Sequence, residues 1–272
     1  MLFQKIAGAL VTGLAQGSMI ALVSLGYTMV YGILKLINFA HSEVFMAGAY
    51  IGLFAIGALG VLVEKIAYAP LRARGGKSAN SRITPLVTAL GMSVLLQNLA
   101  QLLFTAQYRG YPRLLPLQHT RTVIFVTAIG VMVGLQFLVH RTWTGKAMRA
   151  LSMNIEAARL MGIRTGWIIA LTFVTGSMLA AVGAVLYCLD QSQVYPTMGV
   201  TIGTRAFVAA VIGGIGSIPG AMLGGVLIGI IGELTKLTPY SGLQDVLVFT
   251  VLIGVLLVRP TGLLGKAGIE KV

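Results

Sequence analysis

Charged and amide side chains are scarce in this sequence, and three of them stand close together near its start. Asn38, His41 and Glu43 lie within an otherwise apolar region. An imidazole and a carboxylate are groups that transfer protons in many enzymes, but no nucleophile or third orienting group accompanies them here. His41 and Glu43 are also too few ligands to hold a metal ion. The pattern therefore indicates neither a catalytic site nor a metal site.

Polar side chains at membrane depth usually face the interior of a helix bundle or a water-filled path, because burying them in lipid is costly. On a continuous helix Asn38 and His41 would share one face, and Glu43 would lie off it. These residues either line a translocation path or break a helix, or they form a polar cluster that ties two helices together. Gln97 and Gln101 form a second stripe, which either touches a polar solute or makes interhelical hydrogen bonds worth about 1 kcal/mol or less each.

One glycine-rich run raises the question of phosphate binding. Residues 75–78 read Gly-Gly-Lys-Ser, like the end of the phosphate-binding loop G-x-x-x-x-G-K-[ST]. The first glycine of that motif is missing and no strand is expected before the run, so we reject the assignment. Without such a loop, the chain is predicted to be no enzyme and to carry no cofactor. Any energy from ATP must then come from separate subunits.

Composition places the chain in a membrane. Its 272 residues are 57% hydrophobic and only 10% charged, whereas a soluble domain carries about 25% charged residues. Residues 6–34, 44–63 and 83–106 are free of charge, and each exceeds the roughly 18 residues that suggest a membrane span. The sequence therefore predicts an all-α polytopic membrane protein. The net charge of +13 is confined to particular loops, which makes nucleic acid a poor second choice of partner.

The positions of the basic residues predict the orientation of the chain. Loops at residues 64–82 and 140–166 are rich in Lys and Arg, which is typical of cytoplasmic loops. The tail with Arg259, Lys266 and Lys271 likewise predicts a cytoplasmic C-terminus. The number of passes before residue 64 is ambiguous, so the orientation of the N-terminus stays open.

The longest polar interruption that still has a helical pattern lies in the second basic loop. Asn154 is a good N-cap, Glu156 suits the positive end of the helix dipole, and Gly162 suits the left-handed conformation that ends a helix. About two turns of capped helix are too short to span a bilayer. The segment is either a surface helix that a partner protein grips or an ordinary connecting loop with a helical turn.

A dense run of glycines marks the C-terminal third. It contains Gly213, Gly214, Gly216 and Gly220, and Ser217 can cap a helix that has Pro219 in its first turn. We expect two short helices joined at residues 213–217. This is either a discontinuous element near a translocation path or a tight helix–helix contact, and the second interpretation is slightly favoured. Arg205, just before the run, is expected to be a lone charge that snorkels to the membrane edge.

Several motifs along the chain resemble those of one family. They are residues 26–33 (GYTMVYGI), 37–44 (INFAHSEV), 64–72 (EKIAYAPLR), 91–93 (GMS) with 96–98 (LQN), 213–221 (GGIGSIPGA) and 259–262 (RPTG). Together they resemble the permease subunit of bacterial ABC importers for branched-chain amino acids, of the LivH type. Ser42 stands where the family usually has glycine after Ala-His. Relatives also carry more chain between residues 50 and 64 and around residues 110–119.

The resemblance implies a single permease domain over residues 1–272, with about seven or eight membrane-embedded helices in the bacterial inner membrane. It implies that residues 153–162 form the coupling helix, which seats in a groove of an ATPase subunit. Glu156, Ala157, Ala158 and Gly162 match the family's pattern there, and Asn154 caps the helix. The implied partners are a second homologous permease, two ATPase subunits that bind the ATP, an external amino-acid-binding protein and membrane lipid.

The resemblance leaves the cargo open. The first choice is a branched-chain amino acid, carried along a mostly apolar path with few polar groups and no fixed binding charge. Urea or a short amide carried by the same architecture is the alternative, because the Asn-x-Ala-His pattern does not separate the two. A stand-alone secondary transporter is a third hypothesis. It predicts inverted repeats and paired charges at the membrane midplane, and neither is evident in the sequence.

Overall fold

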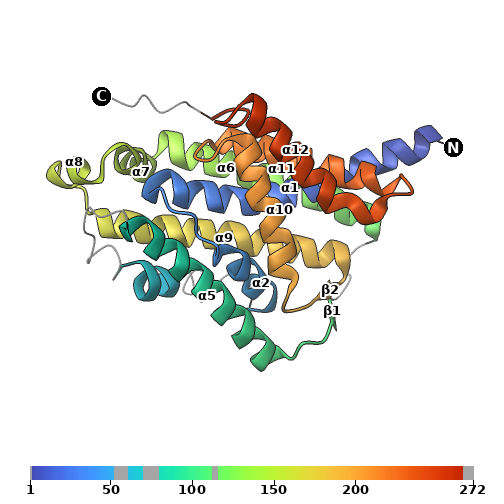
Figure 1. The fold of residues 1–272 in the computed structure, drawn as a ribbon, viewed down its shortest axis with the longest axis horizontal. Helices are drawn as coiled ribbons and strands as arrows, with labels where there is room; N and C mark the ends of the chain where they lie inside the picture. The colour runs from blue at the N-terminus through green and yellow to red at the C-terminus, as the bar shows by residue number, and fades with distance from the viewer. Residues whose placement is uncertain (1, 52–60, 70–79, 112–115, 266–272) are drawn as a thin grey trace.

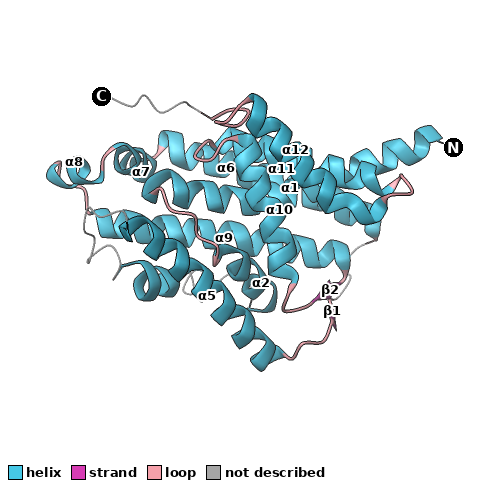
Figure 2. Cartoon of the chain, in the orientation of Figure 1, coloured by secondary structure: helices cyan, strands magenta, loops and turns pink. Residues whose placement is uncertain are grey.

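A computed structural model describes residues 2–51, 61–69, 80–111 and 116–265. The described chain is helical apart from one antiparallel pairing of two-residue strands, so the all-α prediction is confirmed there (Figures 1 and 2). The elements are α1 (Leu2–Leu34), α2 (His41–Ile51), the π-helix η1 (Glu64–Tyr68), α5 (Asn80–Phe104), β1 (Arg109–Gly110), α6 (Leu117–Arg141), α7 (Trp143–Met153), α8 (Ile155–Leu160), α9 (Thr165–Gln191), β2 (Gln193–Val194), α10 (Met198–Gly213), α11 (Ile218–Lys236), the 3₁₀-helix η2 (Ser241–Leu243) and α12 (Gln244–Val258). The Gly-Gly-Lys-Ser run, Lys266 and Lys271 lie outside the described residues.

Within the described ranges, six helical segments are long and apolar enough to cross a membrane. They are Phe3–Leu34, Leu86–Phe104, His119–Arg141, Thr165–Gln191, Ile218–Lys236 and Ser241–Val258. The helices α2 and α10, with 11 and 16 residues, are shorter than these spans. At 1.5 Å per residue they reach about 17 and 24 Å, less than the roughly 30 Å of a hydrocarbon core. Both nevertheless lie largely buried among the longer helices.

The centre of the bundle is α1, which packs along α11 on one side and α9 on another (Figure 1). Glycines bring the backbones of α1 and α11 into contact. A Cβ atom added to Gly17 would lie 2.7 Å from the Cα of Val226, and one added to Gly225 would lie 2.5 Å from the Cα of Ala21. Small residues let membrane helices approach this closely, and van der Waals packing then holds them together.

The glycine run joins α10 to α11 through a tight turn. Gly214 and Gly216 have positive φ angles of 103° and 95°, which glycine adopts at little cost. Ser217 caps α11, because its hydroxyl accepts a hydrogen bond from the N–H of Gly220 at 3.2 Å. The junction and the cap match the prediction, but α11 is not a short helix, because its 19 residues are enough to cross a membrane.

Two of the sequence motifs, residues 213–221 and 259–262, meet at this turn. The N–H groups of Leu263 and Leu264 donate to the carbonyls of Ile212 and Gly213 at 2.8 and 2.9 Å. A Cβ atom on Gly262 would lie 2.6 Å from the Cα of Gly214. The chain after α12 thus satisfies carbonyls at the C-terminus of α10, which would otherwise lack partners.

The ends of the bundle differ. The helices α7 and α8 lie at the end where α12 finishes and the chain leads to its C-terminus (Figure 1). The strand pair β1–β2 and the N-terminus lie toward the opposite end. The basic loop of residues 140–166 and the C-terminal segment therefore share one side of the structure.

Candidate functional site

The short helix α8 is closed by a cap at each end. Asn154 has an extended backbone, with φ −159° and ψ 114°, and its side-chain oxygen accepts from the N–H of Ala157 at 3.0 Å. Gly162 has a φ of 80°, its N–H donates to Arg159 O at 3.1 Å, and the N–H of Ile163 donates to Ala158 O at 3.1 Å. This pair of bonds is a Schellman motif. The capped helix predicted within residues 153–162 is therefore present, although Met153 belongs to α7.

The surface of α8 divides into a buried and an exposed part. Ala158 is buried and joins the hydrophobic core, whereas Glu156 and Ala157 are exposed. Leu160 and Met161 are 89% and 82% exposed. Exposed apolar side chains grouped at one place mark an interaction surface. The helix projects from the end of the bundle in Figure 1, so a partner can reach it.

The helix that supports α8 is α7, which falls within the predicted basic loop of residues 140–166. Its N-cap is Thr142, whose hydroxyl oxygen accepts from the N–H of Gly145 at 3.1 Å. Ala147, Met148 and Leu151 face the core at helical spacing. A threonine followed by this apolar spacing is the signal that could have revealed the helix.

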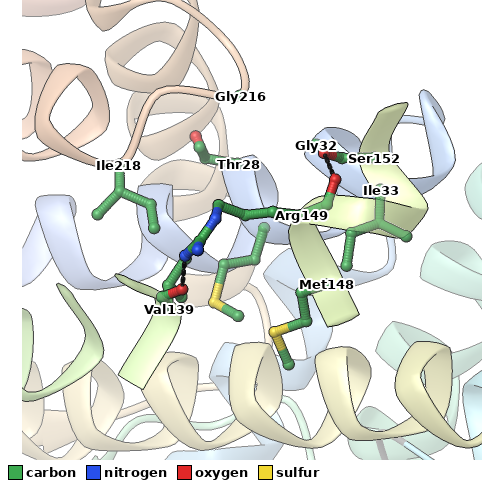
Figure 3. Close-up of a pocket in the computed structure, with 10 residues that line it drawn as sticks. Thr28, Gly32, Ile33, Val139, Met148, Arg149, Ser152, Gly216 and Ile218 are labelled. Carbon is green, nitrogen blue, oxygen red and sulfur yellow. Dashed lines mark hydrogen bonds between the residues drawn. The ribbon is translucent and has the colours of Figure 1, made fainter. Parts of the chain in front are cut away.

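A small cavity of about 90 Å³ lies beside α7, between α1 and the 213–217 turn (Figure 3). Arg149 reaches across it and donates a hydrogen bond to the carbonyl of Val139, near the C-terminus of α6. A guanidinium is favourable there, since the helix dipole is negative at that end. Arg149 thus fixes α7, and through it α8, against the bundle.

His41, the second of the three polar residues of the first region, is the first residue of α2. His41 is 2% exposed and sits in a slot between α1 and α9. A Cβ atom on Gly176 would lie 3.9 Å from its Cε1 atom, and the Tyr27 ring approaches it edge-on with centroids 4.9 Å apart. Gly26 contacts the ring from α1. The ring of His41 packs between two helices, and its Nε2 atom has no hydrogen-bond partner, so a polar tie between these helices stays a prediction.

Asn38 and His41 do not lie on one continuous helix, so they share no helical face. The helix α1 ends at Leu34, Lys35 takes a left-handed φ of 54°, and α2 begins only at His41. Asn38 is buried in the intervening turn, where its carbonyl accepts from the N–H of His41 at 3.0 Å. The helix break that was one of the open interpretations is therefore present at these residues.

Glu43 lies in the first turn of α2 and is fully buried. It lines a cavity of about 150 Å³ between α2, α5 and α10. Its Oε1 atom lies 3.4 Å from the hydroxyls of both Ser42 and Ser93. Gln97 and Gln101 lie further along α5 and are half-buried, while the α5 residues that line this cavity are Leu90 and Ser93. The structure thus brings Glu43 to Ser93, which sequence reasoning had not singled out as a site residue.

The predicted glycine contact is present at the α10–α11 turn. A Cβ atom on Gly213 would lie 2.8 Å from the N atom of Ala221, and Gly220 faces it across the turn. Gly214 packs against the segment after α12, and Gly216 has open space around its Cα. Among the described residues, no three His, Cys, Asp or Glu side chains gather as metal ligands would.

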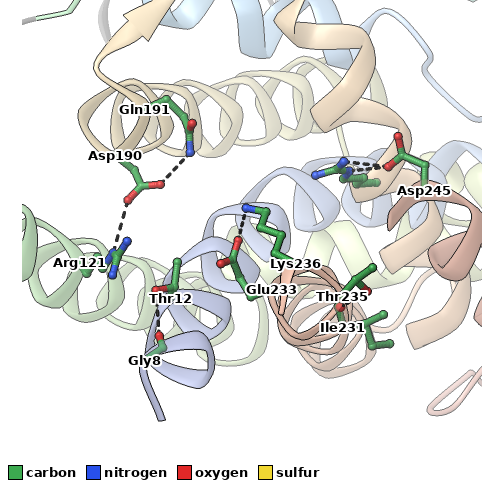
Figure 4. Close-up of polar contacts among 11 residues, drawn as sticks. Gly8, Thr12, Arg121, Asp190, Gln191, Ile231, Glu233, Thr235, Lys236 and Asp245 are labelled. Carbon is green, nitrogen blue, oxygen red and sulfur yellow. Dashed lines mark hydrogen bonds and ion pairs between the residues drawn. The ribbon is translucent and has the colours of Figure 1, made fainter. Parts of the chain in front are cut away.

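Arg205 is not the lone charge that the sequence suggested. Its Nε and Nη2 atoms donate to Asp245 Oδ1 at 3.0 and 2.8 Å, which joins α10 to the start of α12 (Figure 4). The two residues lie 40 positions apart in the sequence, so their pairing depends on the packing of α12. Other ion pairs, Arg121 with Asp190 and Lys236 with Glu233, lie at the ends of α9 and α11.

Comparison with known proteins identifies the family. Residues 9–106 and 73–256 match the family described as "Branched-chain amino acid transport system / permease component". The chain is 41% identical to the high-affinity branched-chain amino acid transport system permease protein BraD of Pseudomonas aeruginosa, with 97% of each chain covered. It is 37% identical to the LivH permease protein of Escherichia coli K12, with 96% of each covered. No solved structure matches the chain.

The alignment with the Pseudomonas protein spans 303 positions, more than the 272 residues of this chain. That relative therefore has internal residues that this chain lacks, as the sequence motifs indicated. A more distant relative, the probable branched-chain amino acid transport permease protein LivH of Methanocaldococcus jannaschii, is 26% identical and covers 91% of this chain. The chain is a multi-pass membrane transport subunit rather than an enzyme, and it belongs to the branched-chain amino acid transport system permease family.

Proposed function

We propose that this chain forms half of the translocation path of an ATP-driven importer for branched-chain amino acids. Full-length similarity to permease proteins named for this transport supports the cargo. The observation that carries the mechanism is α8, a doubly capped helix at the end of the bundle with apolar side chains exposed. A rigid, protruding helix of this kind transmits movement between a membrane domain and a partner.

In this proposal α8 is the coupling helix of residues 153–162. Asn154 and Gly162 fix its two ends, Ala158 packs it onto the bundle, and Leu160 and Met161 enter the groove of an ATPase subunit. Ala157, which is small and exposed, lets the groove approach the helix backbone. Glu156 either engages the ATPase or only stabilises the start of its own helix.

The proposed assembly contains two ATPase subunits, a second homologous permease and an external amino-acid-binding protein. ATP is bound by the ATPase subunits. Their closure on α8 must favour one conformation of the paired membrane domains over another, because only a difference in affinity between two states shifts an equilibrium. The binding protein delivers the amino acid to the opposite end of the bundle.

We further infer the topology. The six apolar spans together with the buried short helices α2 and α10 make up about seven or eight membrane-embedded helices of one permease domain, residues 1–272. The end that carries α7, α8 and the last residues of α12 faces the cytoplasm of a bacterial inner membrane, since its loop of residues 140–166 is basic.

Uptake of labelled leucine in a strain that lacks this chain tests the proposal, with urea as the competing cargo. We expect leucine uptake to fall and to return when the chain is restored on a plasmid. Unchanged leucine uptake with lost urea uptake would assign the alternative cargo. Purification of the tagged permease is expected to recover an ATPase subunit, and its absence would favour a stand-alone transporter.

A further inference from the structure

We propose that the cavity between α2, α5 and α10 binds the α-ammonium group of the transported amino acid, with the Glu43 carboxylate as its counter-ion. The inference rests on the proposed function and names the residue that selects the cargo within the membrane. It differs from the expectation of a path without a fixed charge. The site's chemistry fits a small zwitterion with an aliphatic side chain.

The first observation is that the Glu43 carboxylate has few hydrogen-bond donors. The side chain is 0% exposed, and its Oε2 atom has no hydrogen-bond partner. Ser42 has a single hydroxyl hydrogen to donate, and its Oγ atom lies 2.8 Å from Phe39 O and 3.4 Å from Glu43 Oε1. The shorter contact takes the hydrogen, so Ser93 is left as the donor to Oε1, at 3.4 Å. A buried carboxylate with so few donors is costly unless a cation or further donors join it.

The second observation is the absence of a cation from the described surroundings of Glu43. In the described ranges the ion pairs join Arg205 to Asp245, Arg121 to Asp190 and Lys236 to Glu233, and Glu43 takes part in none of them. Arg205 and Asp245 line a neighbouring cavity, where their charges offset each other. The other two pairs lie near the ends of α9 and α11 (Figure 4). A ligand that brings its own positive charge would supply what the chain does not.

The lining of the cavity matches the remainder of an aliphatic amino acid. Phe39, Phe207, Leu90 and Val200 provide apolar walls, and the hydroxyl groups of Tyr27, Ser93 and Thr204 add hydrogen-bonding capacity. An ammonium group has three N–H donors, which one carboxylate and neighbouring hydroxyls can accept. The volume of about 150 Å³ is several times the roughly 30 Å³ of a water molecule.

The cavity can be reached from the face of the subunit between α5 and α10. Leu90 and Val200 are each 48% exposed, and Thr204 is exposed as well. A second cavity of about 230 Å³ shares Val200 and Thr204 and continues to Arg205 and Asp245, between α10 and α12. The two cavities lie side by side along the same stretch of α10.

Glycines on α10 create the close approach to Glu43. A Cβ atom on Gly199 would lie 3.0 Å from Glu43 Oε2, and one on Gly203 would lie 3.1 Å from the Cα of Ser42. The backbone of α10 therefore packs directly on the first turn of α2. The alternative role for Glu43 is to stabilise the N-terminus of α2 through the helix dipole, and this role would not depend on the cargo.

The test separates these roles by measuring transport and ATP hydrolysis in the same vesicles. The whole importer, with its ATPase subunits and binding protein, is reconstituted into proteoliposomes with wild-type chain, Glu43→Gln or Glu43→Asp. For Glu43→Gln we expect labelled leucine uptake per ATP hydrolysed to fall about tenfold, since hydrogen bonds to charged groups are worth more than neutral ones. ATP hydrolysis stimulated by the binding protein should stay within about twofold. Glu43→Asp should recover part of the uptake.

The matched control is Glu233→Gln, which removes a carboxylate outside the cavity and should leave uptake per ATP unchanged. Equal uptake per ATP in Glu43→Gln and wild type would overturn the inference, and so would a parallel loss of uptake and ATP hydrolysis in an assembled complex. A wild-type importer that carries urea and not leucine would instead overturn the proposed function.

A measurement on the wild-type importer covers the case in which the variants do not assemble. A hydrophobic carbodiimide attaches to buried carboxyl groups, and the adduct on Glu43 is quantified by mass spectrometry. We expect saturating leucine to slow formation of the adduct at least about threefold, because the bound ammonium group occupies the carboxylate. Equal rates with and without leucine would contradict the proposed site.

Discussion

The short helices α2 and α8 are built alike and placed in opposite surroundings. Each follows a break in the chain, and each carries a glutamate in its first turn, Glu43 in α2 and Glu156 in α8. At α8 the caps satisfy the helix ends through Asn154 and Gly162, and Glu156 is exposed to solvent. At α2 the glutamate is fully buried and one of its oxygens has no partner.

The contrast between α2 and α8 indicates that a break between helices can serve two purposes. A break whose polar groups are all satisfied within the chain is rigid, which suits an element that transmits force to a partner. A break that leaves a buried carboxylate with few hydrogen-bond donors costs free energy. A bound ligand that supplies the missing donors offsets that cost.

Replacing Gly203 by valine should have the largest effect, because it acts on the buried break. The new side chain would meet Ser42 at the start of α2, within a contact between two helix backbones. Overpacking of this kind costs about 1–3 kcal/mol or more. We expect loss of transport together with a lower unfolding temperature of the purified permease. The control is Gly130→Val on α6, where no atom lies within 4 Å of the added Cβ, and a similar loss there would remove the argument from packing.

Replacing Gly162 by valine should damage the exposed break without unfolding the bundle. A β-branched residue at a φ of 80° is strained by roughly 1–3 kcal/mol, although nothing lies within 4 Å of the new Cβ. We expect uptake to be lost, with membrane insertion and the yield of permease unchanged. Gly166→Val, four residues later in an equally open position, is the matched control. Normal ATP-coupled uptake in Gly162→Val would count against α8 as the coupling helix.

These two glycines also show how far the sequence could lead. Gly162 was predictable because the Schellman motif is local, and Asn154, Glu156 and Gly162 all lie within a few residues of one another. Gly203 was not predicted, since its meaning depends on Ser42, which is distant in sequence and arrives only through the packing of α10 on α2. Local hydrogen-bonding rules therefore predicted the exposed break better than the buried one.

The apolar spans and the charged residues show the same contrast between local features and contacts that depend on packing. The number and apolar length of the spans predicted a helical membrane protein, because a bilayer imposes helices of about 20 residues. The partner of Arg205 was missed, since a snorkelling arginine and one paired with Asp245 have the same local sequence. The helix break before Asn38 could not be selected from the open interpretations, because Lys35 takes a left-handed conformation that is rare for a residue with a side chain.

Removing the N-cap of α8 should have an intermediate effect. In Asn154→Ala the N–H of Ala157 loses its acceptor, and an N-cap of this type is worth about 1 kcal/mol. We expect partial loss of leucine uptake, with a weaker recovery of the ATPase subunit when the permease is purified. Asn154→Ser keeps an acceptor and should behave like the wild type. Equal uptake in the alanine and serine variants would show that the cap is not needed for coupling.

The smallest effect is expected from Glu156→Gln, the counterpart of Glu43→Gln at the exposed break. Glu156 is exposed in the first turn of α8, where its charge stabilises the helix by roughly 0.3–1 kcal/mol at low ionic strength. If that is its only role, uptake should fall less than about threefold, and salt should reduce the difference from wild type because it screens exposed charges. Leucine uptake measured at low and at physiological ionic strength checks this. A loss as large as that of Glu43→Gln, insensitive to salt, would mean that Glu156 contacts the ATPase directly, and the two glutamates would then differ in partner rather than in importance.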